Sequence, residues 1–445
     1  MFLLAKIYYM MYPTGRRQYR YRTLPPDILS NLPQKVIDEI LICLPLRDAV
    51  RTSILSKKWR YIWRRLPQLT LEHTLWKKRE DITDLTRNFS EIVRHIYCYH
   101  AGPIKKFTLC IPYLDLDRRC PYIDRLISFL SRNGIQHLVL RLPIRGNSYE
   151  LPPLFFTCFQ LRHLTLYNCS MNHPPHFKGF DWLTSLELHD VTISSKLLER
   201  LISRSPLLEQ FVLHISGALS NVIEISAPML RSFDYTGNIS SVLLKNVPLL
   251  AKFSLSQREY HVAAGKCNIA MFFESFSALE HLHLNDMSFV AGAGEIPTRL
   301  PFNLNYVKHV CISSIYLSDL DEVSCALCLI RSFPYLQYME MKVEASDDND
   351  ILALESLEVE RFSDVTFNHL REVKLIQTNG TIPEMQLMKL LLAKSPRLVR
   401  MLIEPCLVEE SATVKILAEL TKLKRASPKA EVVYKLDKHP NLGPV

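Results

Sequence analysis

The sequence predicts a mixed α/β chain. A small module of three helices comes first, and a long curved solenoid follows, with parallel strands inside and helices or loops outside. Three observations support this fold class. Apolar residues recur at helical spacing in residues 32–66. A short leucine-rich pattern recurs from about residue 104 onward. Only 12 glycines occur in 445 residues, which disfavours a doubly wound sheet with its glycine-rich turns.

Length and composition indicate a globular chain of two or three domains, with 48% hydrophobic and 22% charged residues. No run of 18 apolar residues occurs, so we expect no transmembrane helix. In residues 1–24 an apolar run precedes the basic residues, which is the wrong order for a secretory signal. We expect these residues to be a disordered basic extension whose place in the mature protein the sequence leaves open.

The net charge of +9 is concentrated in two segments, residues 1–26 and 57–66, each with five basic and no acidic residues. The rest of the chain is therefore close to neutral. A neutral body argues against a groove that follows a phosphate backbone, so we expect no nucleic-acid partner, and no membrane partner either.

The 11 cysteines are an odd number without a secretory signal, which favours reduced thiols in an intracellular protein of the nucleus, the cytoplasm or both. Cys325 and Cys328 form a lone CxxC pair, and a zinc site needs four ligands. His281 and His283 share a strand face, but the sequence indicates no third ligand. His173 and His176 lie in a proline-rich loop, and a metal site is no better supported there. We expect buried helix cysteines, no metal and no cofactor.

Three short helical patterns lie in residues 32–66. The first is ended by Pro45, because proline cannot continue a helix, and the second covers Asp48–Leu55. The third begins near Ser56. So small a unit cannot bury all of its apolar side chains, and the remaining stripe must pack against the rest of the chain or against a partner.

The long middle of the chain is a repeat array. The segment from Leu161 to Cys169 fits LxxLxLxxC in full, and the first leucine recurs at steps of 22, 25, 22, 20 and 29 residues. These steps lie near the ~20–29-residue period of leucine-rich repeats. Each LxxLxL forms a short parallel strand whose inward side chains stack on those of its neighbours. Helical patterns at residues 194–201 and 321–330 are expected on the outside, and the register between residues 284 and 370 stays open.

Alternation along each strand places the intervening residues on the concave face of the solenoid. Such faces serve for binding in repeat proteins, although a merely solvated face is an equal alternative for any single residue. The candidate target-binding residues are His163, Tyr167, Glu187, His189, His214, Asp234, His281 and His283.

The segment from Leu32 to Trp63 reads LPxxVIxxILxxLPxRDAVRTSxLSKKWRxxW and resembles the F-box of plant F-box proteins without a gap. The resemblance implies a helical module that binds a Skp-type adaptor and through it joins a cullin–RING ubiquitin ligase. The positions it assigns to adaptor binding are Leu32, Pro33, Ile40, Leu41, Leu44, Pro45, Val50, Leu55 and Trp59.

Residues 359–405 resemble the FBD segment that closes many plant F-box proteins with leucine-rich repeats. They carry a strand pattern, a turn at Thr378–Gly380, an apolar helix at 385–392 and a last strand at 398–403. Physically we expect a cap that covers the end of the solenoid core. The predicted domains are a basic extension (1–24), an F-box (25–71), a repeat solenoid (100–358) and FBD-like repeats (359–435).

No phosphate-binding loop, dinucleotide fingerprint, nucleophile elbow or HExxH motif occurs. The F-box resemblance implies a substrate-recognition subunit of an SCF-type ubiquitin ligase, and the absence of these motifs leads us to expect that the subunit is non-catalytic. The target and any required modification stay open. Two alternatives also stay open, a scaffold that binds or sequesters the adaptor without a target, and a sensor whose solenoid holds a small ligand.

Overall fold

The structure is a computed structural model that describes residues 31–72, 82–111, 120–143, 148–172, 177–215, 222–256, 269–285, 287, 296–344, 355, 357–359, 365–406 and 410–435. The chain forms two compact units, Met1–Phe180 and Asp181–Val445, here the N-terminal and C-terminal units. The predictions for residues 1–24 and for His173 and His176 lie outside the described residues.

The N-terminal unit begins with a helical module of α2 (Gln34–Ile42), α3 (Leu46–Arg51) and two 3₁₀ helices, η1 (Thr52–Ile54) and η2 (Ile62–Arg65). Pro33 and Pro45 are the N-cap residues of α2 and α3. Proline is tolerated at a helix start, because the first N–H groups of a helix have no intrahelical partner.

The prediction of a regular third helix from Ser56 is wrong, because residues 57–61 form turns and only η2 is helical. Pro67 favours an extended residue before it, and β1 begins at Gln68, so little length remains for a helix. The apolar residues of this segment are nevertheless buried where the pattern placed them, notably Trp59, Ile62 and Leu66.

Four parallel strands continue the N-terminal unit in the order β1 (Gln68–Leu71), β2 (Lys106–Cys110), β3 (His137–Arg141) and β5 (His163–Tyr167). Helices α4 (Ile82–Tyr99) and α5 (Pro121–Arg132) and the 3₁₀ helix η4 (Pro153–Thr157) connect them, and β4 (Tyr149–Glu150) pairs with β6 (Cys169–Met171). The inward residues of β2, β3 and β5 are fully buried, as the LxxLxL pattern predicts.

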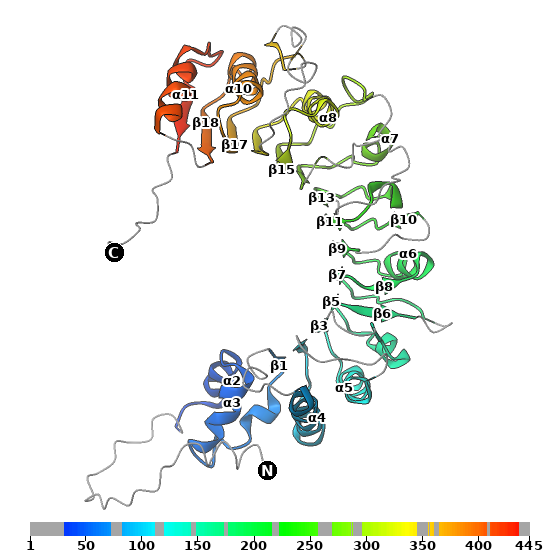
Figure 1. Cartoon of the computed structure of the whole chain (residues 1–445). Helices are drawn as coiled ribbons and strands as arrows, with labels where there is room; N and C mark the ends of the chain where they lie inside the picture. The colour runs from blue at the N-terminus through cyan, green and yellow to red at the C-terminus, as the bar shows by residue number, and fades with distance from the viewer. Residues whose placement is uncertain are drawn as a thin grey trace, which may run out of the picture. The chain divides into compact units, whose positions relative to one another are not determined.

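The C-terminal unit is a longer parallel array of the same kind, with its helices on one side of the strands (Figure 1). Its first strands are β7 (Ser185–His189), β9 (Gln210–His214), β11 (Ser232–Thr236) and β13 (Lys252–Ser256). The array goes on through β14 (His281–Leu284), β15 (His309–Ile315), β16 (Tyr338–Val343), β17 (Glu372–Thr378), β18 (Arg400–Pro405) and β19 (Glu431–Tyr434).

The helices of the C-terminal unit are α6 (Ser195–Ser203), α7 (Ile269–Phe273), α8 (Leu320–Arg331), α10 (Ile382–Lys394) and α11 (Glu410–Lys422). Short additions complete it, namely β8 (Thr192–Ile193), the 3₁₀ helix η5 (Ile239–Ser241) and the pair β10 (Ile223–Ser226) and β12 (Val242–Asn246). The helices predicted at residues 194–201, 321–330 and 385–392 are confirmed as α6, α8 and α10.

Inward side chains of adjacent strands stack into the core of the C-terminal unit. Phe211 and Phe233 occupy one register position on β9 and β11, with ring centroids 5.0 Å apart and planes 4° from parallel. Phe253 on β13 follows at 5.7 Å from Phe233. Aromatic rings thus replace leucine at the middle inward position and bury large area at each step.

Two strands of the C-terminal unit were not placed by the sequence analysis. One lies where the register was left open, and the other lies where no strand was predicted. The long step between residues 284 and 336 contains β15, whose inward residues Val310 and Ile312 match the repeat with valine and isoleucine in place of leucine. The predicted last strand is also not the last, because α11 and β19 follow it and β19 pairs with β18.

Candidate interaction surfaces

The N-terminal helical module has an exposed apolar row. Pro33, Val36, Ile40 and Leu44 follow one another at steps of three or four residues, so they lie along one side of α2. Val36 and Pro33 are exposed, whereas Ile40 and Leu44 are half-buried. The second helical row, Ile37 and Leu41, is buried. The single stripe predicted from sequence therefore divides into one inward and one outward row.

Two apolar residues near η1 are also exposed, Ile54 by 52% and Leu55 by 53%. Lys57 and Lys58 follow after Ser56 and are exposed, and Lys58 Nζ donates to the Leu32 carbonyl at 2.9 Å. An apolar surface beside a basic rim is suited to a protein partner with an apolar groove and acidic edges.

The nine predicted adaptor positions fall into three groups by burial. Leu41 and Trp59 are only 1% and 2% exposed, so in this structure they belong to the core of the chain and offer no surface to a partner. This corrects the assignment of these two side chains. The half-buried positions are Leu32, Ile40, Leu44 and Val50, and the exposed ones are Pro33, Pro45 and Leu55.

Four of the predicted target-binding residues meet on the strand face of the C-terminal unit. His189 Nδ1 lies 2.9 Å from His214 Nδ1, so one imidazole donates and the other accepts. His189 Nε2 lies 3.9 Å from Glu187 Oε2, and His214 Nε2 lies 3.6 Å from Asp234 Oδ1. The contact with His214 is the main cause that lowers the pKa of Asp234 below its usual value. The pleat thus joins residues of β7, β9 and β11 into one polar cluster.

His281 and His283, the other predicted pair of this unit, have separate partners. The ring of His281 stacks on His309 of β15 with centroids 4.4 Å apart, and His283 Nε2 lies 2.7 Å from Ser313 Oγ. A pocket of about 400 Å³ opens here, and its lining includes Asp234, Lys252, His281, His283, His309 and Tyr338.

The two predicted residues of the N-terminal unit also lie on its strand face. His163 stacks on His137 with centroids 4.2 Å apart, and the Arg141 guanidinium lies 5.1 Å from the centre of the Tyr167 ring. Both pairs are register neighbours on β3 and β5.

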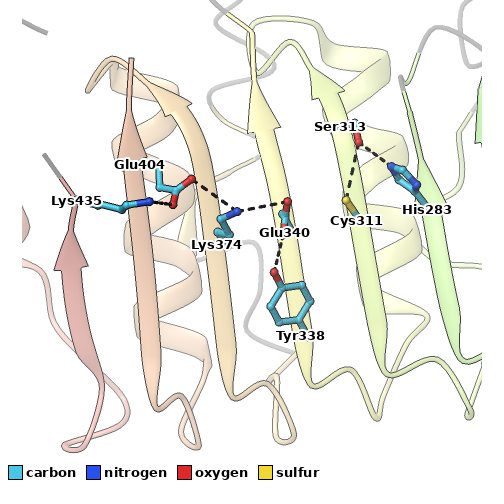
Figure 2. Close-up of polar contacts among 8 residues, drawn as sticks. All are labelled: His283, Cys311, Ser313, Tyr338, Glu340, Lys374, Glu404 and Lys435. Carbon is cyan, nitrogen blue, oxygen red and sulfur yellow. Dashed lines mark hydrogen bonds and ion pairs between the residues drawn. The ribbon is translucent and has the colours of Figure 1, made fainter. Parts of the chain in front are cut away.

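A chain of charged contacts that was not predicted crosses β16, β17 and β18 and reaches Lys435, the residue after β19 (Figure 2). Lys374 Nζ lies 3.7 Å from Glu340 Oε1 and 3.6 Å from Glu404 Oε2. Lys435 Nζ lies 3.0 Å from Glu404 Oε1, a hydrogen bond that lowers the pKa of Glu404. Tyr338 Oη donates to Glu340 Oε2 at 2.5 Å. The alternation of outward residues on these strands could have revealed the chain, but only after the strands had been aligned.

Within the described residues, no group of three or more histidine, cysteine, aspartate or glutamate side chains could hold a metal ion. Cys325 and Cys328 are buried on α8, and burial raises the pKa of Cys328 to about 11. Among the described helices, none is long and apolar enough to cross a membrane.

Comparisons with known proteins agree with both parts of the chain. A family model for the F-box domain matches residues 29–70. A second, described as the leucine-rich repeats of FBD-associated F-box protein At5g56370, matches residues 123–341. F-box/FBD/LRR-repeat protein At1g13570 of Arabidopsis thaliana is 33% identical over 427 residues, which cover 93% of this chain and 99% of that protein.

Two further Arabidopsis thaliana proteins are more distant. FBD-associated F-box protein At5g56370 is 30% identical over 248 residues, or 54% of this chain and 56% of that protein. Putative F-box/FBD/LRR-repeat protein At2g05300 is 23% identical over 448 residues, or 93% of this chain and 98% of that protein.

Proposed function

This chain belongs to the plant F-box/FBD/LRR-repeat proteins, and from that premise we propose that it is the non-catalytic substrate-recognition subunit of an SCF-type, cullin–RING ubiquitin ligase. Its F-box binds a Skp-type adaptor, and its strand face holds a target protein. Ubiquitin transfer is then performed by other subunits, and the receptor contributes by holding the target close to them.

The observation that carries the proposal is the outward apolar row of α2 together with Ile54 and Leu55. Small helical modules bury what apolar surface they can, so apolar side chains left at the surface of one indicate a partner. Ile40 and Leu44 are the half-buried members of this row, Val50 is a further half-buried candidate, and Lys57 and Lys58 provide exposed basic groups. Leu41 and Trp59 then act by holding the module in shape.

Target binding is assigned to the strand faces, where polar groups of several strands come together. The cluster of Glu187, His189, His214 and Asp234 offers hydrogen-bond donors and acceptors in a half-buried setting, in which such bonds discriminate between partners. Separate strands supply these groups, so a target must match their spacing.

Adaptor pull-down with the double variant Ile54→Asp and Leu55→Asp tests the proposal. Two carboxylates placed in an apolar contact should abolish co-purification with a Skp-type adaptor while the thermal unfolding midpoint stays near that of the wild type. Val414→Asp is the matched control, because Val414 on α11 is 66% exposed and belongs to the C-terminal unit. Adaptor binding by the double variant at the wild-type level would refute the docking surface.

A reconstituted ubiquitylation assay separates a substrate receptor from a scaffold. Proteins that co-purify with the wild-type chain under proteasome inhibition should be ubiquitylated by the complete ligase, but not when the double variant replaces the wild type. If they are captured equally well and never modified, the scaffold alternative holds.

A further inference from the structure

Three basic side chains lie side by side in the pocket on the strand face of the C-terminal unit. Lys252 of β13 is in register with His281 of β14, and His281 is in register with His309 of β15. Register neighbours on parallel strands are separated by about 4.8 Å, so one bound group can contact all three side chains. Tyr338 of β16 is the next residue of this row and also lines the pocket.

The two imidazoles form a flat wall of the pocket. Their planes are 11° from parallel and their centroids 4.4 Å apart. Each ring carries a donor N–H, and Lys252 is exposed. No ion pair joins Lys252 to an acid among the described residues.

Three acids near the pocket contact other groups. Asp234 contacts His214, Glu340 accepts from Tyr338 Oη, and Glu280 lies 3.4 Å from Lys308. Asp234 also lines the pocket, so its wall holds one carboxylate as well as the ammonium of Lys252. Burial is the main cause that lowers the pKa of His281; His309, Lys252 and Lys308 lower it further, and Glu280 raises it.

We propose that this pocket binds an anionic group of the target protein, a phosphate or a carboxylate, between Lys252 and the stacked imidazoles of His281 and His309. The inference rests on the proposed function, in which the strand face holds a target, and adds the chemistry that the target must present. The anion accepts hydrogen bonds from the ammonium and from the ring N–H groups.

The N-terminal unit contains a matched triad that serves as an internal control. Lys106, His137 and His163 are in register on β2, β3 and β5, and the two imidazoles stack at 4.2 Å and 11°. The triads therefore share residue types and stacking. The triad of the C-terminal unit lies in a pocket whose lining also includes Cys311 and Tyr338.

Nuclear magnetic resonance of the purified full chain, with ¹³C-labelled histidine rings, tests the proposal. Sulfate serves as a probe with the charge of a phosphate dianion, and acetate as a probe for a carboxylate, both titrated at constant ionic strength because exposed charges are screened by salt. The ring signals of His281 and His309 should shift in a saturable manner, at a concentration about tenfold below that needed at His137 and His163. The variants His281→Gln and His137→Gln identify the signals.

Lys252→Gln should weaken the response about tenfold, whereas the matched change Lys106→Gln should leave it unaltered. A saturable response to sulfate alone indicates a phosphorylated target, and a response to acetate as well indicates an acidic side chain. Shifts of equal size at both triads would mean an adventitious ion only and would overturn the proposal, as would the absence of saturation. Adaptor pull-down on the same samples reports the proposed function separately, because Lys252 is remote in sequence from the F-box.

Discussion

Replacing Leu41 and Leu55 one at a time by alanine separates folding from docking in the F-box. Sequence similarity assigns both leucines to the adaptor contact, but Leu41 is buried and Leu55 is half exposed. Truncating a buried leucine removes its transfer free energy and leaves a cavity, at a cost of about 3 kcal/mol. Truncating an exposed one costs well under about 1 kcal/mol.

Hydrogen exchange of the α2 and α3 amides measures this difference. A loss of about 3 kcal/mol corresponds to exchange roughly a hundredfold faster, since each 1.4 kcal/mol is about a factor of ten. Leu41→Ala should therefore show fast exchange over Gln34–Arg51, while Leu55→Ala exchanges like the wild type. Adaptor affinity should fall for Leu55→Ala even though its module is fully folded.

The opposite outcome would refute the burial argument. If Leu41→Ala leaves the exchange rates unchanged and weakens the adaptor as much as Leu55→Ala does, then Leu41 contacts the adaptor directly. The inward row of α2 would then have to turn outward when the adaptor binds.

Three further predictions concern the C-terminal cap, the histidine cluster and the thiols. Glu384 accepts three backbone N–H groups at the start of α10, so Glu384→Ala should lower the free energy of unfolding by about 3 kcal/mol, and an unchanged denaturant midpoint would contradict this. His214→Phe should raise the pKa of Asp234 towards its ordinary value in carboxyl NMR titrations. Because the pKa of Asp234 is depressed in the folded state, the pair stabilises the fold at pH values above the ordinary aspartate pKa near 3.9. The stabilisation is about a few tenths of a kcal/mol at this half-exposed site, and it is lost as the pH falls through the lower pKa of the folded state. Burial raises the pKa of Cys158 and Cys169 to about 12, so iodoacetamide should leave both intact until the chain unfolds, and early modification of either would contradict the burial. Among the described cysteines the fast ones should be Cys43, Cys98 and Cys406.

The strands of the repeat array could be predicted because their signal is local. A strand with one buried face alternates, and the leucines at fixed spacing state which residues point inward. Two strands were missed for different reasons. β15 carries the pattern with Val310 and Ile312 in place of leucine, so a search by residue size and alternation would have found it. β1 lies in LPQLTL, which fits LxxLxL, but this stretch stands at the end of a segment already assigned to helices.

The division of α2 into two rows could not be predicted with the same certainty. Five apolar residues within nine cover more than half of a helix circumference, and the sequence does not say which row faces the chain's own core. That choice depends on the elements that pack against α2, which lie later in the chain. Consequently seven of the nine adaptor positions stay predictions, while Leu41 and Trp59 are part of the core.

The polar clusters were predictable as faces but not as contacts. Alternation alone places Glu187, His189, His214 and Asp234 on one side of their strands. Their distances depend on register, because a shift by two residues would separate them while keeping the same face. The charge chain at Glu340, Lys374 and Glu404 was missed for this reason, since the strands that carry it are joined by segments of unequal length.

The last described strand of the C-terminal unit, β19, is protected against pairing with another chain. An unpaired strand at the edge of a sheet exposes backbone groups that can pair with another chain. β19 is that edge of the C-terminal unit among the described strands, and it has four residues. Lys435 follows directly and bonds Glu404 of the preceding strand, while Arg425 donates to the Ala430 carbonyl at 2.9 Å just before it. A short strand held at both ends by basic side chains is a poor template for further strands. Residues 359–435 therefore add three strands, β17, β18 and β19, and place charge beside the last strand that the structure describes.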